Sequence, residues 1–168
     1  MAIATDEIIE VYNAHFRAVF GYCVCRLFRK DLAEDATSEV FVRLVERYPD
    51  LKSRSKDQIR YWLYGTASNV VAKHLRDSAR QRQIQAALAN ERVKLSSDVA
   101  SSELLDWPTL YEAIRRLKEQ DQAIVVMRYF HGFGFAEIAK SLDMADVAVR
   151  VRLHRSIRTL RKSLGVRV

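Results

Sequence analysis

The sequence predicts an all-α protein made of two small helical domains joined by a linker. Along most of the 168 residues, apolar side chains recur every three or four positions, which is the period of an amphipathic helix. The chain holds only five glycines and two prolines, too few for the many tight turns of an all-β protein. Between residues 77 and 105 the apolar pattern fades into a polar stretch rich in Ala and Ser. We therefore expect one domain over residues 1–76, a partly helical linker over 77–105 and a second domain over 106–168.

Three helices account for the first domain. The first covers residues 5–29, and its apolar stripe consists of Ile8, Tyr12, Phe16, Val19, Phe20, Cys23 and Leu27. The second has Asp31 as its expected N-cap and ends at Pro49. Its expected buried residues are Val40, Phe41, Leu44, Val45 and Tyr48. A polar, basic loop over residues 49–56 leads to a third helix, which begins near Asp57 and packs through Ile59, Leu63, Thr66, Ala67 and Val70.

The second domain opens with two helices that each have an aspartate at the expected start. Asp106 is the expected N-cap of the first, with Pro108 in the first turn, where a proline is tolerated. Asp121 is the expected N-cap of the second, which extends to Phe130.

The chain ends in a predicted helix-turn-helix, a motif whose second helix lies in the major groove of DNA. A short amphipathic helix over residues 135–142 is followed by a turn at 143–145 and by a last helix that Asp146 is expected to cap. The last 24 residues carry seven cations and one acid. Their apolar stripe consists of Val149, Leu153, Ile157, Leu160 and Leu164. A basic helix alone is more often a solvated surface, but its pairing with a correctly spaced first helix favours DNA as the partner.

The face opposite this stripe is the expected base-reading surface. It presents Val147, Arg150, Val151, His154 and Arg158. Residues near the start of the helix reach base edges, where arginine suits bidentate contact with guanine. Arg152, Arg155 and Arg161 lie further round or further along the helix, and we expect them to hold phosphates, which fix register without reading sequence.

Composition argues against several other classes of protein. No apolar run approaches the ~18 residues of a membrane span, and the acidic start is unlike a signal peptide, so we expect a cytoplasmic protein. Cys23 and Cys25 are the only cysteines; they face different sides of one helix, and we expect ordinary thiols. Because we find no metal-ligand spacing, phosphate-binding glycine loop or nucleophile arrangement, we expect no cofactor, no metal and no enzyme activity.

Two segments together resemble the extracytoplasmic-function (ECF) group of bacterial RNA polymerase sigma factors. The first is the run from Ala33 to Leu44, followed by Trp62, Leu63, Tyr64 and Asn69. The second runs from Leu110 to Leu164, and its best-matching parts are residues 137–139 and 152–155. The resemblance implies a sigma-2-like bundle and a sigma-4-like helix-turn-helix. It also implies a protein that binds core RNA polymerase, directs it to promoter DNA and is held inactive by an anti-sigma factor.

The resemblance assigns an acidic face to polymerase binding. Asp35 and Glu39 lie one helical turn apart, with Arg43 beside them, and would meet the clamp helices of the large polymerase subunit. A local explanation stands beside this one: Asp35 complements the helix dipole, and Glu39 pairs with Arg43 on the same helix. The two explanations are compatible.

The resemblance also assigns the basic loop and the third helix to melting and reading the promoter −10 element. Unstacked bases bind aromatic rings while cations follow the backbone. The candidate contacts are Lys52, Arg54, Lys56, Trp62, Asn69, Lys73 and Arg76. Because Trp62 neighbours the apolar stripe, a core role competes for it. The helix-turn-helix would read the −35 element as duplex, through Val147, Arg150, Val151, Arg152, His154, Arg155 and Arg158.

The sequence departs from the family pattern at several positions. Lys118 replaces the usual Pro, Asp143 replaces a Gly in the turn, and Ala145 to Ala148 replace a small-polar and Gly-Thr start. Gly65 and Lys73 stand where the family more often has Arg and Asp. A glycine inside a helix costs ~1 kcal/mol relative to alanine, so we expect Gly65 to mark close packing or a close approach of DNA.

Two other functions fit parts of the sequence. An ordinary helix-turn-helix regulator that binds operator duplex as a dimer would explain the basic tail, but not the acidic and aromatic first half. A sigma-like decoy that binds an anti-sigma protein and no DNA would be expected to carry a receiver domain or to lack the basic face.

Overall fold

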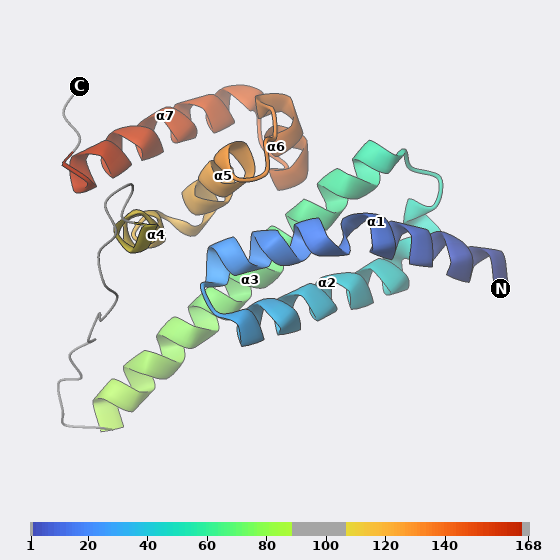
Figure 1. Ribbon diagram of the computed structural model, residues 1–168, viewed down its shortest axis with the longest axis horizontal. Coiled ribbons are helices and arrows are strands. Elements are labelled where there is room, and N and C mark those ends of the chain that lie inside the picture. Colours follow the sequence, from blue (N-terminus) through green and yellow to red (C-terminus); the bar gives the residue numbers. More distant parts are fainter. Residues whose placement is uncertain (1, 89–106, 166–168) are drawn as a thin grey trace.

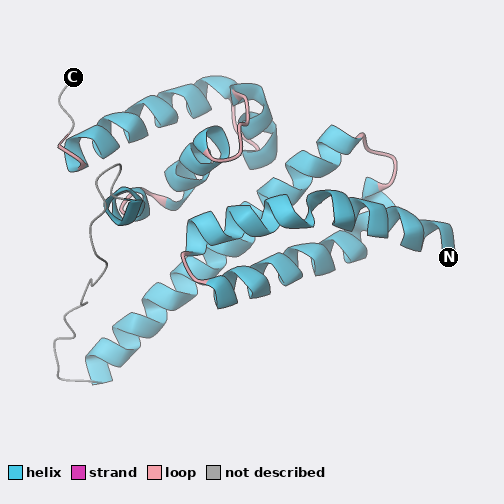
Figure 2. Cartoon of the chain, viewed as in Figure 1, coloured by secondary structure: helices cyan, strands magenta, loops and turns pink. Residues whose placement is uncertain are grey.

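A computed structural model describes residues 2–88 and 107–165, which form seven helices and no strand within those ranges (Figure 2). In chain order the helices are α1 (Ala2–Leu27), α2 (Lys30–Leu51), α3 (Lys56–Leu88), α4 (Trp107–Arg115), α5 (Glu119–Tyr129), α6 (Phe135–Leu142) and α7 (Asp146–Ser163). The expected all-α class is therefore confirmed. The expected N-cap Asp106 lies outside the described residues.

Helices α1, α2 and α3 form the N-terminal half, with α1 packed on both of the others (Figure 1). Its centre is formed by side chains with no exposed surface, among them Val19, Tyr22, Leu44, Leu63 and Val70. Two details of the expected second helix are wrong. Val45 is 55% exposed, because the buried stripe runs through Val40 and Leu44 instead. Helix α2 also continues past Pro49, so that Leu51 is buried and the Lys52 N–H still donates to the Tyr48 carbonyl.

Helices α4 to α7 form the C-terminal half, in which α6 and α7 make the expected helix-turn-helix (Figure 1). Val149, Leu153 and Leu160 are buried, and Ile157 and Leu164 are half-buried, so the expected stripe of the last helix faces the core. In the turn, Asp143 adopts a left-handed conformation with φ of 51°. Asparagine and aspartate tolerate this region better than most non-glycine residues, which explains how Asp143 stands where the family has glycine.

Three aspartates expected as N-caps lie inside their helices instead. The cap positions belong to Arg29, Lys118 and Ala145, none of which makes a side-chain capping bond. Each aspartate binds an arginine: Asp31 pairs with Arg29, Asp121 with Arg152 and Asp146 with Arg150. A carboxylate in the first turn still complements the helix dipole, and an ionic partner has displaced the capping geometry.

The two halves pack directly against each other. Helix α6 lies across α3, and α5 contacts α1 and α3 (Figure 1). Gly65 sits at the crossing of α3 and α6, where a Cβ atom would lie 2.3 Å from the Ser141 carbonyl oxygen. Of the two reasons offered by the sequence for this glycine, close packing is therefore the one that the structure shows.

Candidate nucleic-acid interface

The outward face of α7 is open to a partner. Val147 is 70% exposed and Val151 42% exposed, so both side chains are accessible on the face opposite the buried one. Arg150, His154, Arg155 and Arg158 are exposed beside them. Apolar and cationic groups together on one helical face match what the major groove offers, namely thymine methyl groups, base-edge acceptors and phosphates.

Two arginines of α7 have defined partners within the chain. Arg150 pairs with Asp146 one turn earlier, and its guanidinium lies 4.2 Å from the centroid of the Phe135 ring on α6. Its side chain is thereby held at the start of the helix, the position suited to base contact. Arg152 is half-buried and donates to Asp121 on α5 at 2.8 Å. The Arg152 guanidinium thus joins α7 to α5. A phosphate bound by Arg152 would have to share this guanidinium with the Asp121 carboxylate.

Most of the expected −10 residues lie on the surface of the N-terminal half, around the basic loop and along α3. Lys52, Arg54 and Lys56 are exposed around the loop, and Asn69 and Lys73 are exposed on α3. Trp62 is half-buried and packs against the core, while part of its ring remains accessible. The Trp62 side chain can therefore pack against the core and also contact a DNA base.

A cleft of about 600 Å³ runs along this face of α3. One wall comes from α3 and the loop, and the other comes from the end of α6. The residues around it are Arg54, Gln58, Tyr61, Trp62, Gly65, Thr66, Asn69, Lys140, Ser141 and Asp143. The cleft thus brings rings, amides and cations together, and three of the ten residues around it belong to the C-terminal domain.

The expected polymerase-binding acids differ in their surroundings. Asp35 is exposed, and among the described residues no ion pair involves it. Glu39 is half-buried and receives Arg43 from its own helix, together with Lys73 at 3.9 Å and His74 at 3.7 Å from α3. The local pairing of Glu39 with Arg43 is confirmed, and of the two expected acids only Asp35 has no ion pair among the described residues.

Sequence reasoning missed a polar contact at the centre of the boundary between the halves. The Tyr64 hydroxyl and His131 Nδ1 are 3.0 Å apart, and the Tyr22 ring packs against both rings. Burial lowers the pKa of His131, and the nearby Arg60 charge lowers it further. Burial also raises the pKa of Tyr64 to about 12. His131 is therefore neutral at this boundary.

Acidification should weaken the structure through His131. Its pKa is below the 6.5 of a free imidazole, so the folded protein binds this proton less well than the unfolded chain. The stabilising contribution is complete above pH 6.5 and is lost as pH falls from there toward the lowered pKa. We expect the thermal midpoint to drop between pH 7.5 and 5.5, and to drop less in His131→Asn. His15 also has a pKa lowered by burial, and it is unchanged in both proteins. Identical pH profiles for the two proteins would refute this assignment.

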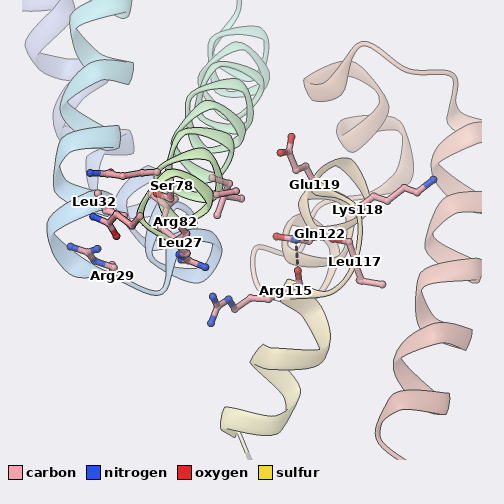
Figure 3. A pocket seen from close by; sticks show the side chains of 14 residues that line it. Leu27, Arg29, Leu32, Ser78, Arg82, Arg115, Leu117, Lys118, Glu119 and Gln122 are labelled. Atoms are coloured by element: carbon pink, nitrogen blue, oxygen red, sulfur yellow. Dashed lines mark hydrogen bonds between the residues drawn. The ribbon is translucent and has the colours of Figure 1, made fainter. Parts of the chain in front are cut away.

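A second cleft, of about 650 Å³, separates the halves near the end of α1 (Figure 3). Leu27 and Arg82 line it from the N-terminal half, and Arg115 lines it from the C-terminal half, whereas the ammonium end of Lys118 points away from it (Figure 3). Glu119 is the only acid among its lining residues. Four basic residues line this basic cleft together with four leucines, although Arg29 pairs with Asp31 and Arg115 with Glu112.

Comparisons with known proteins agree with this two-module arrangement. Residues 11–81 match the family described as sigma-70 region 2, and residues 109–160 match sigma-70 region 4. The ECF RNA polymerase sigma factor BldN of Streptomyces coelicolor is 30% identical over 95% of this chain, which spans 61% of BldN. RNA polymerase sigma factor YlaC of Bacillus subtilis is 23% identical, over 95% of this chain and 92% of YlaC. A co-crystal structure of the sigma factor RpoE with the anti-sigma factor NepR from Bartonella quintana has a TM-score of 0.63 at 16% identity, covering both chains fully, and shows the same fold.

The described part of the chain thus consists of a helical bundle followed by a basic helix-turn-helix. The chain belongs to the sigma-70 family of RNA polymerase sigma factors, in its ECF group. Sigma factors are not enzymes. The region 2 match accounts for the first half of the chain, which an ordinary helix-turn-helix regulator would leave unexplained. None of the described helices has the length and apolarity that crossing a membrane requires.

Proposed function

We propose that this protein binds core RNA polymerase and directs it to promoters as a dissociable, non-enzymatic subunit. Residues 1–76 bind polymerase and melt the −10 element, residues 106–168 read the −35 duplex, and residues 77–105 link them. The observation that carries the proposal is the open face of α7, where cations and two exposed valines stand on a helix that is otherwise packed. A decoy that binds no DNA would have no use for this face.

On the −35 duplex, residues in the first turns of α7 contact the bases. Arg150 is positioned there by Asp146 and Phe135, and it suits a guanine. Val147 and Val151 suit thymine methyl groups on either side of it. Arg155 and Arg161 bind phosphates, and Arg158 continues the exposed face of Arg150 and His154. Arg152 contributes chiefly by holding α7 on α5.

On the −10 element, the loop and α3 bind the separated strand. Lys52, Arg54 and Lys56 attract its phosphates, and Tyr61 and Trp62 offer faces for unstacked bases. Asn69 and Lys73 extend the contact along α3. Stacking on an aromatic ring is worth ~1–3 kcal/mol per base, enough for two rings to offset much of the cost of opening a short stretch of duplex.

Polymerase and an inhibitor are the two expected protein partners. Asp35, with Glu39 and Arg43 behind it, meets a basic surface of core polymerase, because an exposed acid with no ion-pair partner among the described residues gains most from an opposed cation. An anti-sigma factor holds the protein inactive; for RpoE, a complex with the anti-sigma factor NepR is known. The basic cleft of Figure 3 is open to an acidic segment of such an inhibitor. Because its partners are polymerase and promoter DNA, we place the protein in the cytoplasm.

Footprinting of the polymerase complex tests this division of labour. With core polymerase and this protein on one promoter, DNase protection should cover the upstream −35 duplex. Permanganate should modify thymines near −10, because they become single-stranded. A Trp62→Ala variant should retain the upstream protection and lose most permanganate reactivity. Reactivity that survives undiminished would remove Trp62 from the melting surface, and reactivity that does not depend on the added protein would contradict the proposal.

A further inference from the structure

Arg26, near the end of α1, is a buried charge that no carboxylate of the described residues neutralises. It is 1% exposed, and arginine is almost never fully buried without an ionic partner. One terminal nitrogen donates to the Tyr22 hydroxyl at 2.6 Å and the other to the Glu119 carbonyl at 3.1 Å, both of which are neutral acceptors. Its Nε has no hydrogen-bond partner in the part of the chain that the structure describes. Because a buried ion is costly without an opposite charge, the surroundings of Arg26 favour the binding of an anion.

The groups close to Arg26 do not supply this negative charge. The carboxylate of Glu119 pairs with Arg76 of α3 at 3.0 Å. Burial raises the pKa of Cys23 to about 11, so this nearby thiol stays neutral. The Tyr22 ring centroid lies 5.6 Å from the guanidinium carbon, and the face of a ring is a weaker partner for a cation than a carboxylate is. The counter-charge of Arg26 therefore has to come from a bound anion.

A cavity of about 260 Å³ adjoins Arg26 and is lined by residues of both halves. Three of its lining residues are buried, namely Arg26, Ser68 and Ser141, and all three carry hydrogen-bond donors. The Ser141 hydroxyl, like Arg26 Nε, has no partner among the described residues. The exposed residues around the cavity are Asn69, Arg76, Gln120 and Asp143. The buried part of the lining thus presents a guanidinium and two hydroxyls, and both acids that line the cavity lie nearer to solvent.

These donors suit a tetrahedral oxyanion, because they come from three different helices. A guanidinium binds phosphate oxygens through charge-assisted hydrogen bonds, and Ser68 and Ser141 add hydroxyl donors from α3 and α6. The exposed Asp143 carboxylate favours phosphate over sulfate, since it accepts a hydrogen bond from a protonated phosphate oxygen, and sulfate carries no such proton. Typical small-molecule sites enclose ~300–1,000 Å³, so this smaller cavity suits a phosphate ion or a small phosphomonoester.

We propose that this cavity binds a phosphate group, either free or carried by a small organic molecule, with Arg26 as its principal ligand. The bound anion supplies the charge that Arg26 lacks, and it accepts hydrogen bonds from Arg26 Nε and the Ser141 hydroxyl. Because Arg26 and Ser68 belong to one half and Ser141 to the other, the anion also stabilises the contact between the halves. The site does not involve the outward face of α7 or the basic loop, and it does not depend on the proposed function.

Thermal unfolding of the full-length protein tests the proposal, because a ligand that binds only the folded state raises the unfolding midpoint. The wild-type protein is unfolded in low concentrations of phosphate, sulfate or chloride, at equal pH and ionic strength. Phosphate should raise the midpoint by at least about 2 °C relative to chloride, and sulfate should raise it less. If phosphate gives no shift, or if sulfate gives the same shift, the cavity is not a phosphate site.

Arg26→Met should lose the phosphate-dependent shift. Arg116→Met is the matched control, since it makes the same change at an exposed arginine just after α4, and it should keep the shift. In chloride, Arg26→Met should be no less stable than wild type, because replacing an uncompensated buried charge by an apolar side chain is often neutral or stabilising. A purely structural Arg26 would instead lower the midpoint of the variant by the same amount in every buffer, and that result overturns the proposal.

A second variant covers the case in which Arg26→Met does not fold. Ser141→Ala removes a hydroxyl that has no partner among the described residues, so the fold should be unaffected, but phosphate affinity should fall about tenfold. Ser156→Ala is its control, because Ser156 is a buried serine on α7 that does not line the cavity. Isothermal titration calorimetry measures these affinities for inorganic phosphate and for adenosine monophosphate.

The calorimetry also distinguishes the two sources of the phosphate group. Tighter binding of adenosine monophosphate would support the site and identify a nucleotide phosphate as its ligand. Binding of inorganic phosphate alone would support the site and identify the free ion. If neither compound binds, or if both bind Ser141→Ala as tightly as wild type, the proposal is wrong.

Discussion

Replacing Arg150 with alanine is expected to remove most of the preference of the C-terminal half for its −35 sequence. A good arginine–guanine contact discriminates by ~1–3 kcal/mol, or about 5- to 150-fold in affinity. Arg150 is the arginine placed for that contact, because Asp146 and the Phe135 ring hold it at the first turn of α7 while it stays exposed. Affinity for the cognate duplex should fall toward the affinity for a scrambled duplex, measured by anisotropy at fixed salt.

Arg161→Ala is the comparison for this prediction. Arg161 is exposed two turns or more beyond the base-reading positions, so its loss should weaken cognate and scrambled duplexes equally and reduce the salt slope by about 1. Equal, sequence-independent losses in both variants would refute the division of α7 into a base-reading start and a phosphate-binding end.

Reversing the charge of Asp35 is expected to cost at least tenfold in affinity for core polymerase. Asp35 is the acid of the expected interface that has no ion pair within residues 2–88 and 107–165, so a lysine there meets an opposed cation with like charge. Glu39 is a poorer target, since its replacement would also break contacts with Arg43 and α3. Fluorescence competition for core polymerase measures the affinity, and duplex binding by α7 should be unchanged.

Glu34→Lys is the matched control. Glu34 is also exposed on the first turns of α2, but it points about 100° away and makes a surface pair with Lys30 at 3.7 Å. A surface pair of this kind is worth ~0.5 kcal/mol or less, so both variants should keep wild-type stability. If the two variants bind polymerase equally well, Asp35 does not lie in the interface.

Most of the helices were predictable from sequence because they have an apolar stripe, whereas α3 continues to Leu88 through a stretch in which that pattern fades. The stripe through Val149, Leu153 and Leu160 fixes which face of α7 is buried, and hence which arginines stand free. Helix ends were less predictable. Asp31, Asp121 and Asp146 have the residue type of an N-cap, but each has an arginine within reach that competes for its carboxylate. Sequence spacing alone does not show whether such a carboxylate accepts from the backbone N–H groups of the helix or from the arginine.

The boundary between the halves was not predictable, because its contacts join residues far apart in sequence. Tyr64 and His131 are 67 positions apart, and the sequence around either residue does not predict a contact with the other. Two local features did point to it. Gly65 interrupts a helix where alanine would be more stable, and Arg26 places a charge next to the apolar stripe of α1. Each is explained only by a neighbouring helix.

Run-off transcription with purified core polymerase on a library of promoter fragments tests the central claim most directly. Wild-type protein should produce transcripts of defined length from a small set of fragments, and core polymerase alone should produce none of them. Asp35→Lys should reduce all of these transcripts together, whereas Arg150→Ala should reduce them while relaxing the −35 sequence that they share. If no fragment gives a transcript that depends on the wild-type protein, it does not act as a sigma factor.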